Sequence, residues 1–154
     1  MTTPRDIVDV ELKAVRWLFD TQKEIAPMVV FINGTEHSML PLSFENDYEK
    51  DLASDVIRRL VKEMEPDGVI YMSEAWTLNI KSDKVPKDLP RPSESKDRIE
   101  VVIVSIEFKT GEKFSCQARI QRAENSVTLG EFDVSENYTL MGRFVDFFPP
   151  KRLN

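Results

Sequence analysis

The first half of the chain combines helical and extended patterns of apolar positions. Helical spacing predicts a helix from Thr3 to Glu24. The residues of its apolar stripe are Val8, Leu12, Val15, Leu18 and Phe19. An apolar run at 28–32 then ends in Asn33-Gly34, a dipeptide typical of type I′ hairpin turns, so 37–44 is predicted to return as the partner strand. Pro41 favours a sheet edge for this strand, because proline has no N–H to donate.

A second helix is predicted from Asn46, which can cap it, to Met64, just before Pro66. Its apolar stripe consists of Tyr48, Leu52, Val56, Ile57, Leu60 and Met64. Four extended patterns follow at 69–80, 99–108, 113–122 and 127–133. The order α-β-β-α-β-β-β-β with short turns predicts an α+β fold. We expect a mainly antiparallel sheet of about six strands, with both helices packed on one face.

Composition favours a single domain over residues 1–154. Hydrophobic residues make up 41% of the chain and charged residues 31%, which is enough apolar material for a core under a charged surface. Three prolines lie among charged and serine residues between Ser82 and Asp97, so this segment is predicted to be a mobile surface loop. Residues 134–154 form an aromatic C-terminal tail.

The charge balance and the single cysteine narrow the range of partners and compartments. The formal charge is −6 and the sequence pI is near 4.9, which disfavours binding to a phosphate backbone. A lone cysteine suits a reducing compartment. No apolar run approaches the roughly 20 residues needed to cross a bilayer, and the N-terminus lacks the apolar region of a signal peptide. We therefore predict a cytoplasmic protein that binds neither membrane nor nucleic acid.

The residues that most often carry catalysis are scarce. His37 is the only histidine and lies beside a predicted turn, where a solvated polar role is the simpler interpretation. Cys116 lies between Phe114 and Ala118 on the apolar face of its predicted strand, where a thiol is inert. One histidine and one cysteine cannot fill a zinc site, and no glycine-rich phosphate loop occurs. The sequence predicts no metal, no cofactor and no catalytic residue.

Glu74 breaks the pattern of its predicted strand. It shares one face with Ile70, Met72, Trp76 and other large apolar residues, so its carboxylate is expected to be buried. A buried carboxylate needs a partner, and Arg98 or Arg119 is the nearest candidate. Two interpretations stay open: a structural Glu–Arg pair, and a ligand-binding site formed by Glu74, Trp76, Arg98 and Arg119.

Several short motifs together resemble a group of small uncharacterised prokaryotic proteins. They are Ser73-Glu74-Ala75-Trp76, Asp97-Arg98-Ile99-Glu100-Val101-Val102 and Ala118-Arg119-Ile120-Gln121-Arg122. The resemblance covers roughly residues 68–122. The group has no assigned activity, so the resemblance implies no mechanism.

Aromatic residues crowd near the C-terminus. Phe144, Phe147 and Phe148 precede a proline pair and a basic end. This cluster can dock on its own domain and cover a sheet face, or it can stay exposed as a partner-binding surface. The strand predicted at 127–133 adds an edge without proline or lysine to protect it. A symmetric dimer that buries this edge or the cluster is therefore also expected.

Two functional hypotheses follow from the sequence. The first is a non-catalytic binding or adaptor domain that acts through protein–protein contacts. The alternative is a small-ligand-binding protein or hydrolase with a pocket around Glu74, Trp76 and Arg98. The two hypotheses differ in whether a concave pocket opens at Glu74 or the strand face there is packed shut.

Overall fold

The computed structural model describes residues 2–78, 98–136 and 143–149. Within these residues the elements are α1 (Pro4–Gln22), β1 (Met28–Asn33), β2 (Glu36–Pro41), α2 (Asp47–Met64), β3 (Gly68–Leu78), β4 (Arg98–Phe108), β5 (Lys113–Ala123), β6 (Ser126–Leu129) and β7 (Asp133–Glu136). The segment predicted to be a mobile loop, 82–97, lies outside the described residues.

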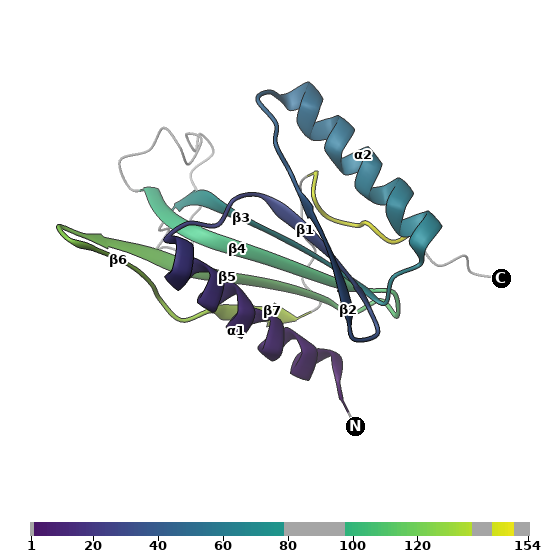
Figure 1. The fold of residues 1–154 in the computed structure, drawn as a ribbon, viewed down its shortest axis with the longest axis horizontal. Coiled ribbons are helices and arrows are strands. Elements are labelled where there is room, and N and C mark those ends of the chain that lie inside the picture. Colours follow the sequence, from purple (N-terminus) through teal and green to yellow (C-terminus); the bar gives the residue numbers. More distant parts are fainter. Residues whose placement is uncertain (1, 79–97, 137–142, 150–154) are drawn as a thin grey trace, which may run out of the picture.

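The strands form one open sheet in which every recorded pairing is antiparallel. The order is β2-β1-β3-β4-β5-β6, and β7 pairs with β5 beside β6. The long strands β3 and β4 pair over their full lengths and form the centre of the sheet (Figure 1). The α+β class and the mainly antiparallel sheet are confirmed. The additional strand β7 was not predicted, because four residues carry too short an alternation to be recognised.

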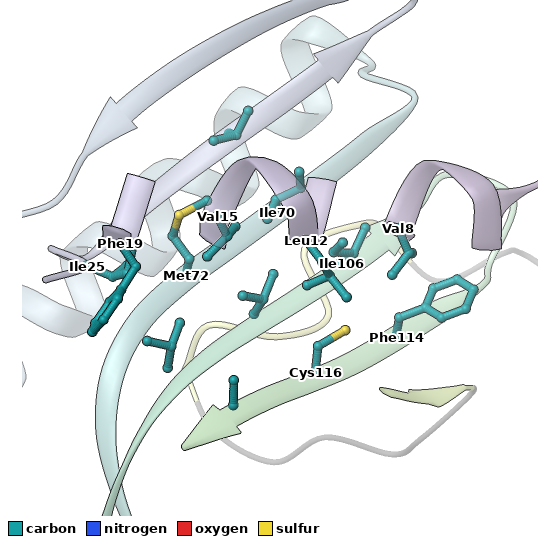
Figure 2. Close-up of a cluster of buried hydrophobic side chains, with 14 of the residues drawn as sticks. Val8, Leu12, Val15, Phe19, Ile25, Ile70, Met72, Ile106, Phe114 and Cys116 are labelled. Atoms are coloured by element: carbon teal, nitrogen blue, oxygen red, sulfur yellow. The ribbon is translucent and has the colours of Figure 1, made fainter. Parts of the chain in front are cut away.

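Helix α1 covers one face of the sheet. Its buried residues are Val8, Leu12, Val15 and Phe19, as the helical spacing predicts. Figure 2 shows these side chains directed toward the strands, where they meet Ile70, Met72, Ile106, Phe114 and Cys116. Thr3 starts the helix with a reciprocal capping box, in which its hydroxyl accepts the N–H of Asp6 and the Asp6 carboxylate accepts the N–H of Thr3. The helix ends at Lys23, whose backbone is left-handed.

Helix α2 covers the opposite face. Ile57 and Val61 pack there against Val29, Phe31, Val69 and Tyr71 of the central strands. Residues 143–149, which we call the C-terminal strap, run beside α2 and add Phe147 to this second core (Figure 1). The prediction that both helices pack on one face is therefore wrong. Alternation places Val69 and Ile70 on opposite sides of β3, and both are fully buried, so each face needs its own cover.

The ends of two predicted strands also differ from expectation. The hairpin turn consists of Gly34 and Thr35, because Asn33 pairs with Glu36, and Gly34 alone takes a positive φ angle. The turn is therefore not the type I′ turn expected at Asn33-Gly34, which needs positive φ at both central residues. The last predicted strand, 127–133, ends at Leu129. Pro41 lies on the edge strand β2, as predicted.

Candidate functional site

Glu74 lies on β3, on the face that α1 covers, but it is not enclosed. Its side chain keeps 29% of its exposure, and its Oε2 accepts the backbone N–H of Ile25 at 3.0 Å. Its Oε1 lies 3.8 Å from Arg122, which is also 2.6 Å from the Glu100 carboxylate. The carboxylate therefore ties the segment after α1 to the sheet and belongs to a half-exposed network of two acids and one arginine.

The predicted ligand-binding residues around Glu74 do not all lie on its face of the sheet. Arg119 is not a partner of Glu74. Ala118 pairs with Val102, which in turn pairs with Glu74, so Ala118 lies on the face of Glu74 and the next residue, Arg119, lies on the opposite face. Trp76 shares the face of Glu74 and is 39% exposed. The side chain of Arg98 lies outside what the structure describes. Arg122, which was not predicted, takes the place expected for Arg119. It is four residues from Ala118, and residues an even number apart in a strand lie on the same face.

A cleft of about 390 Å³ opens on the opposite face of the same strand. It lies where the N-terminal half of α2, the start of the C-terminal strap and the middle of β3 approach one another. Its lining consists of Pro27, Phe44, Lys50, Tyr71, Ser73, Glu74, Ala75, Ile103, Arg143 and Phe144. A concave site at Glu74 is thus present. Its side-chain chemistry, however, comes from the neighbouring residues, because the Glu74 carboxylate is bonded to Ile25 on the α1 face.

Three aromatic rings form a stack at this cleft. The Phe144 ring lies 4.5 Å from the Tyr71 ring at an interplanar angle of 7°, and 5.5 Å from the Phe44 ring at 23°. Lys50 adds a cation, since its Nζ is 5.5 Å from the centre of the Phe44 ring. Arg143 adds a second, whose Nε lies 2.6 Å from the Asp51 carboxylate. The cleft is therefore lined by aromatic rings and by two cationic side chains, Lys50 of α2 and Arg143 of the strap.

The polar groups on β3 at the cleft are two hydroxyls. Burial raises the pKa of the Tyr71 hydroxyl, and a hydrogen bond with the Ser73 side chain opposes part of this rise. The phenol is therefore protonated at neutral pH. Ser73 is 8% exposed and donates to the carbonyl of Glu74 at 3.0 Å. These hydroxyls can orient a ligand but are not placed beside a general base.

The aromatic cluster near the C-terminus is part of the protein's own core. Phe147 is 2% exposed, and Phe144 and Phe148 are partly buried against the residues under α2. Of the two arrangements that the sequence left open, the structure shows the docked one. Partner binding by these three residues stays a prediction, and it requires the strap to leave this position.

A buried carboxylate anchors the strap. Glu107 is 1% exposed, and it accepts the backbone N–H groups of Asp146 at 2.8 Å and Phe147 at 3.0 Å. Burial raises the pKa of Glu107, although these two hydrogen bonds and the charge of Lys113 oppose the rise. Arg58 of α2 holds the strap from the other side by donating to the carbonyls of Arg143 and Val145, each at 3.0 Å.

A row of apolar side chains on α2 faces away from the protein. Tyr48, Leu52 and Val56, which we call the α2 ridge, are 70%, 47% and 49% exposed. They follow one another at four-residue spacing, and Leu52 is about two and a half helical turns from the buried Val61, hence on the opposite side. The predicted apolar stripe of this helix therefore mixed two faces. Val61, which the predicted stripe omitted, is buried and marks the inner face of the helix, opposite to Leu52.

The histidine and the cysteine do not form a catalytic pair. His37 lies on β2, and its Nε2 is 2.6 Å from the Glu11 carboxylate of α1. Cys116 is buried on β5, four strand positions away, which amounts to roughly 19 Å at the usual strand spacing. Burial raises the pKa of the Cys116 thiol to about 12. Within the described residues, no group of acidic, histidine or cysteine side chains has the arrangement of a metal site.

Taken together, these features define an open-sheet α+β domain with a helix on each face, a strap under one helix and a cleft beside the strap. A family model described as bacteriophage lambda protein ea47 matches residues 2–146. The chain therefore belongs to this phage protein family, whose description names no activity. Comparisons with curated proteins and with solved structures gave no significant match. The family match leaves the resemblance based on Ser73–Trp76 and 97–102 untested.

The helices give one further finding about membranes. Neither α1 nor α2, nor any other described part of the chain, forms a helix with the length and apolarity needed to span a bilayer.

Proposed function

We propose that this chain is a non-catalytic binding domain that acts through protein–protein contacts, and that its first contact is with a second copy of itself. The main support for this proposal is the α2 ridge. Tyr48, Leu52 and Val56 form a continuous apolar row on the outside of a helix whose inner side is already packed. Aligned exposed apolar residues of this kind are typical of a contact surface.

Charge complementarity favours a second copy as the occupant. In an antiparallel pair of α2 helices with Leu52 of one copy opposite Val56 of the other, the same register sets Arg59 opposite Glu49. Arg59 is exposed, and within the described part of the chain it has no recorded ion pair. The antiparallel arrangement also places the opposite helix dipoles side by side. The α2 ridge, the Arg59–Glu49 charge pair and the antiparallel helix dipoles thus favour the same two-fold pairing.

The interface is expected to be weak. Three apolar residues per copy form a small contact, and interfaces below about 1,200 Å² are usually transient. Sheet edges offer a further surface for partner strands, since β2 and β6 each pair on one side only among the described residues. A cytoplasmic location stays a prediction that rests on the single cysteine and on the sequence.

Sedimentation velocity over a micromolar concentration range tests the proposal. The wild-type mass should rise from 17.8 kDa toward twice that value as concentration increases. Leu52→Asp should keep the monomer mass throughout, because it places a carboxylate in the ridge. Trp17→Asp is the matched control: Trp17 is 68% exposed on the other helix, and this variant should associate as the wild type does. A wild-type mass that never rises, or equal behaviour of both variants, would contradict self-pairing.

A further inference from the structure

The cleft beside the strap holds a positive charge that no described carboxylate neutralises. Lys50 lies along its wall with its Nζ over the Phe44 ring, and no ion pair is recorded for it within the described residues. Arg143 is different, because its guanidinium contacts the carboxylates of both Asp47 and Asp51. The charge available to a ligand in this cleft is therefore that of Lys50.

The remaining walls favour a flat apolar body. Phe44 and Phe144 contribute aromatic surface, and Ile103 and Ala75 of the central strands contribute aliphatic surface. A volume of about 390 Å³ is within the range of small-molecule sites. The cleft thus combines apolar walls with few polar groups, which is the usual composition of such sites.

The polar groups on β3 can fix the orientation of a ligand. The Tyr71 and Ser73 hydroxyls lie on the same side of the same strand and are hydrogen-bonded to each other, and both line the cleft. The Glu74 carboxylate does not oppose an anion here, because it is bonded to the N–H of Ile25 and lies near Arg122 on the other face of the sheet.

We propose that this cleft binds a small organic carboxylate with a flat apolar body. The carboxylate pairs with the Lys50 ammonium, while the body lies against Phe44 and Ile103. A charge-assisted hydrogen bond is about twice as strong as a neutral one, so Lys50 gives the site its preference for an anion. Lys50 is two positions from Leu52, on the other side of α2, so ligand binding is independent of self-pairing.

Benzoate and benzamide form a matched pair of probes, since they differ in charge and share a flat ring. A titration of the ¹⁵N-labelled full chain, followed by amide chemical shifts, should show benzoate saturating the shifts of Phe44, Tyr71 and Ser73. A molecule this small is expected to bind in the millimolar range. Benzamide should bind about tenfold more weakly, because it lacks the charge that Lys50 recognises.

Two variants separate the cleft from general charge attraction. Lys50→Gln should weaken benzoate binding about tenfold and leave benzamide binding unchanged. Lys62→Gln removes one positive charge near the other end of the same helix and should bind both probes as the wild type does. The proposal is overturned if benzoate moves no cleft amide. It is equally overturned if benzamide binds as tightly as benzoate, or if the two variants weaken benzoate binding to the same extent.

Discussion

Glu107 and Phe147, which are 40 positions apart, are joined by a hydrogen bond in which the Phe147 backbone N–H donates to the Glu107 carboxylate at 3.0 Å. The bond is buried, and the same carboxylate also accepts the N–H of Asp146. Lys113 reinforces the contact through its ion pair with the Asp146 carboxylate. The strap is therefore held to the sheet by polar groups inside the core, in addition to the packing of Phe147.

Loss of the Glu107 carboxylate should destabilise the whole domain. Glu107→Ala leaves two strap N–H groups without their acceptor and opens a void, so we expect the free energy of unfolding to fall by about 3 kcal/mol. Urea unfolding followed by circular dichroism measures this. Glu136→Ala, at an exposed carboxylate, is the control and should change stability by less than about 0.5 kcal/mol. Equal stability of the two variants would show that the strap anchor contributes nothing.

The same carboxylate should give stability a defined pH dependence. The folded pKa of Glu107 is raised, so its protonated form is favoured in the fold. The associated stability is fully present below the unfolded value, near 4.5, and is lost as pH rises through the raised folded value. Asp6 and Asp67 have lowered pKa values and act with the opposite sign, but they are unchanged in a Glu107→Gln variant.

Comparison of the wild type with Glu107→Gln isolates this term. The stability of the wild type minus that of the variant should decrease as pH increases from 4.5 toward neutral. Chemical unfolding at a series of pH values gives the difference. A difference that stays constant, or that increases with pH, would mean that burial does not raise the pKa of Glu107.

Cys116 should be unreactive in the native protein. Its thiol is buried and its pKa is raised to about 12, so almost none of it is thiolate at neutral pH. A thiol reagent such as Ellman's reagent should react only as fast as the domain opens, and at full rate in denaturant. Rapid stoichiometric labelling of the folded protein at pH 7 would show that this part of the core is accessible.

Replacement of Glu74 should cost less than an enclosed ion pair would. The carboxylate is partly exposed, and its shortest recorded hydrogen bond is to the N–H of Ile25, so Glu74→Ala should destabilise by about 1 kcal/mol. Arg122→Ala, which removes the more exposed partner, should cost less than about 0.5 kcal/mol. If both variants lose the same amount of stability, the ion pair is the important contact and the hydrogen bond to Ile25 is not.

Much of the fold could be predicted because its patterns are local. The core residues of α1 were all read from helical spacing, and the alternation of β5 placed Phe114, Cys116, Ala118 and Ile120 on one buried face. The placement of helices on faces could not be predicted in the same way. Strands buried on both sides show continuous apolar runs, as at 99–108, which indicate that both faces of the sheet are covered but not which helix covers each face.

The candidate site was only partly predictable. Glu74 was singled out as a residue that breaks a pattern, but its contacts depend on which face of β5 each arginine occupies. Arg119 lies on the opposite face, and Arg122, three positions further along, lies on the face of Glu74. The cleft depends on the strap, which brings Phe144 onto Tyr71 from a distant part of the chain. The burial of Glu107 could have been predicted from the sequence, because this residue is a carboxylate within the apolar run of β4.

Cysteine cross-linking across α2 tests the proposed self-pairing most directly. The native Cys116 is buried, so introduced thiols at the surface can be followed separately. A mixture of Leu52→Cys and Val56→Cys chains should form a disulfide-linked dimer in higher yield than either variant alone, because antiparallel pairing sets position 52 opposite position 56. In either variant alone the two thiols are offset by roughly 6 Å along the helix axis. Trp17→Cys should remain monomeric. Equal yields in all samples, or the highest yield in a single variant alone, would contradict the antiparallel pairing of α2.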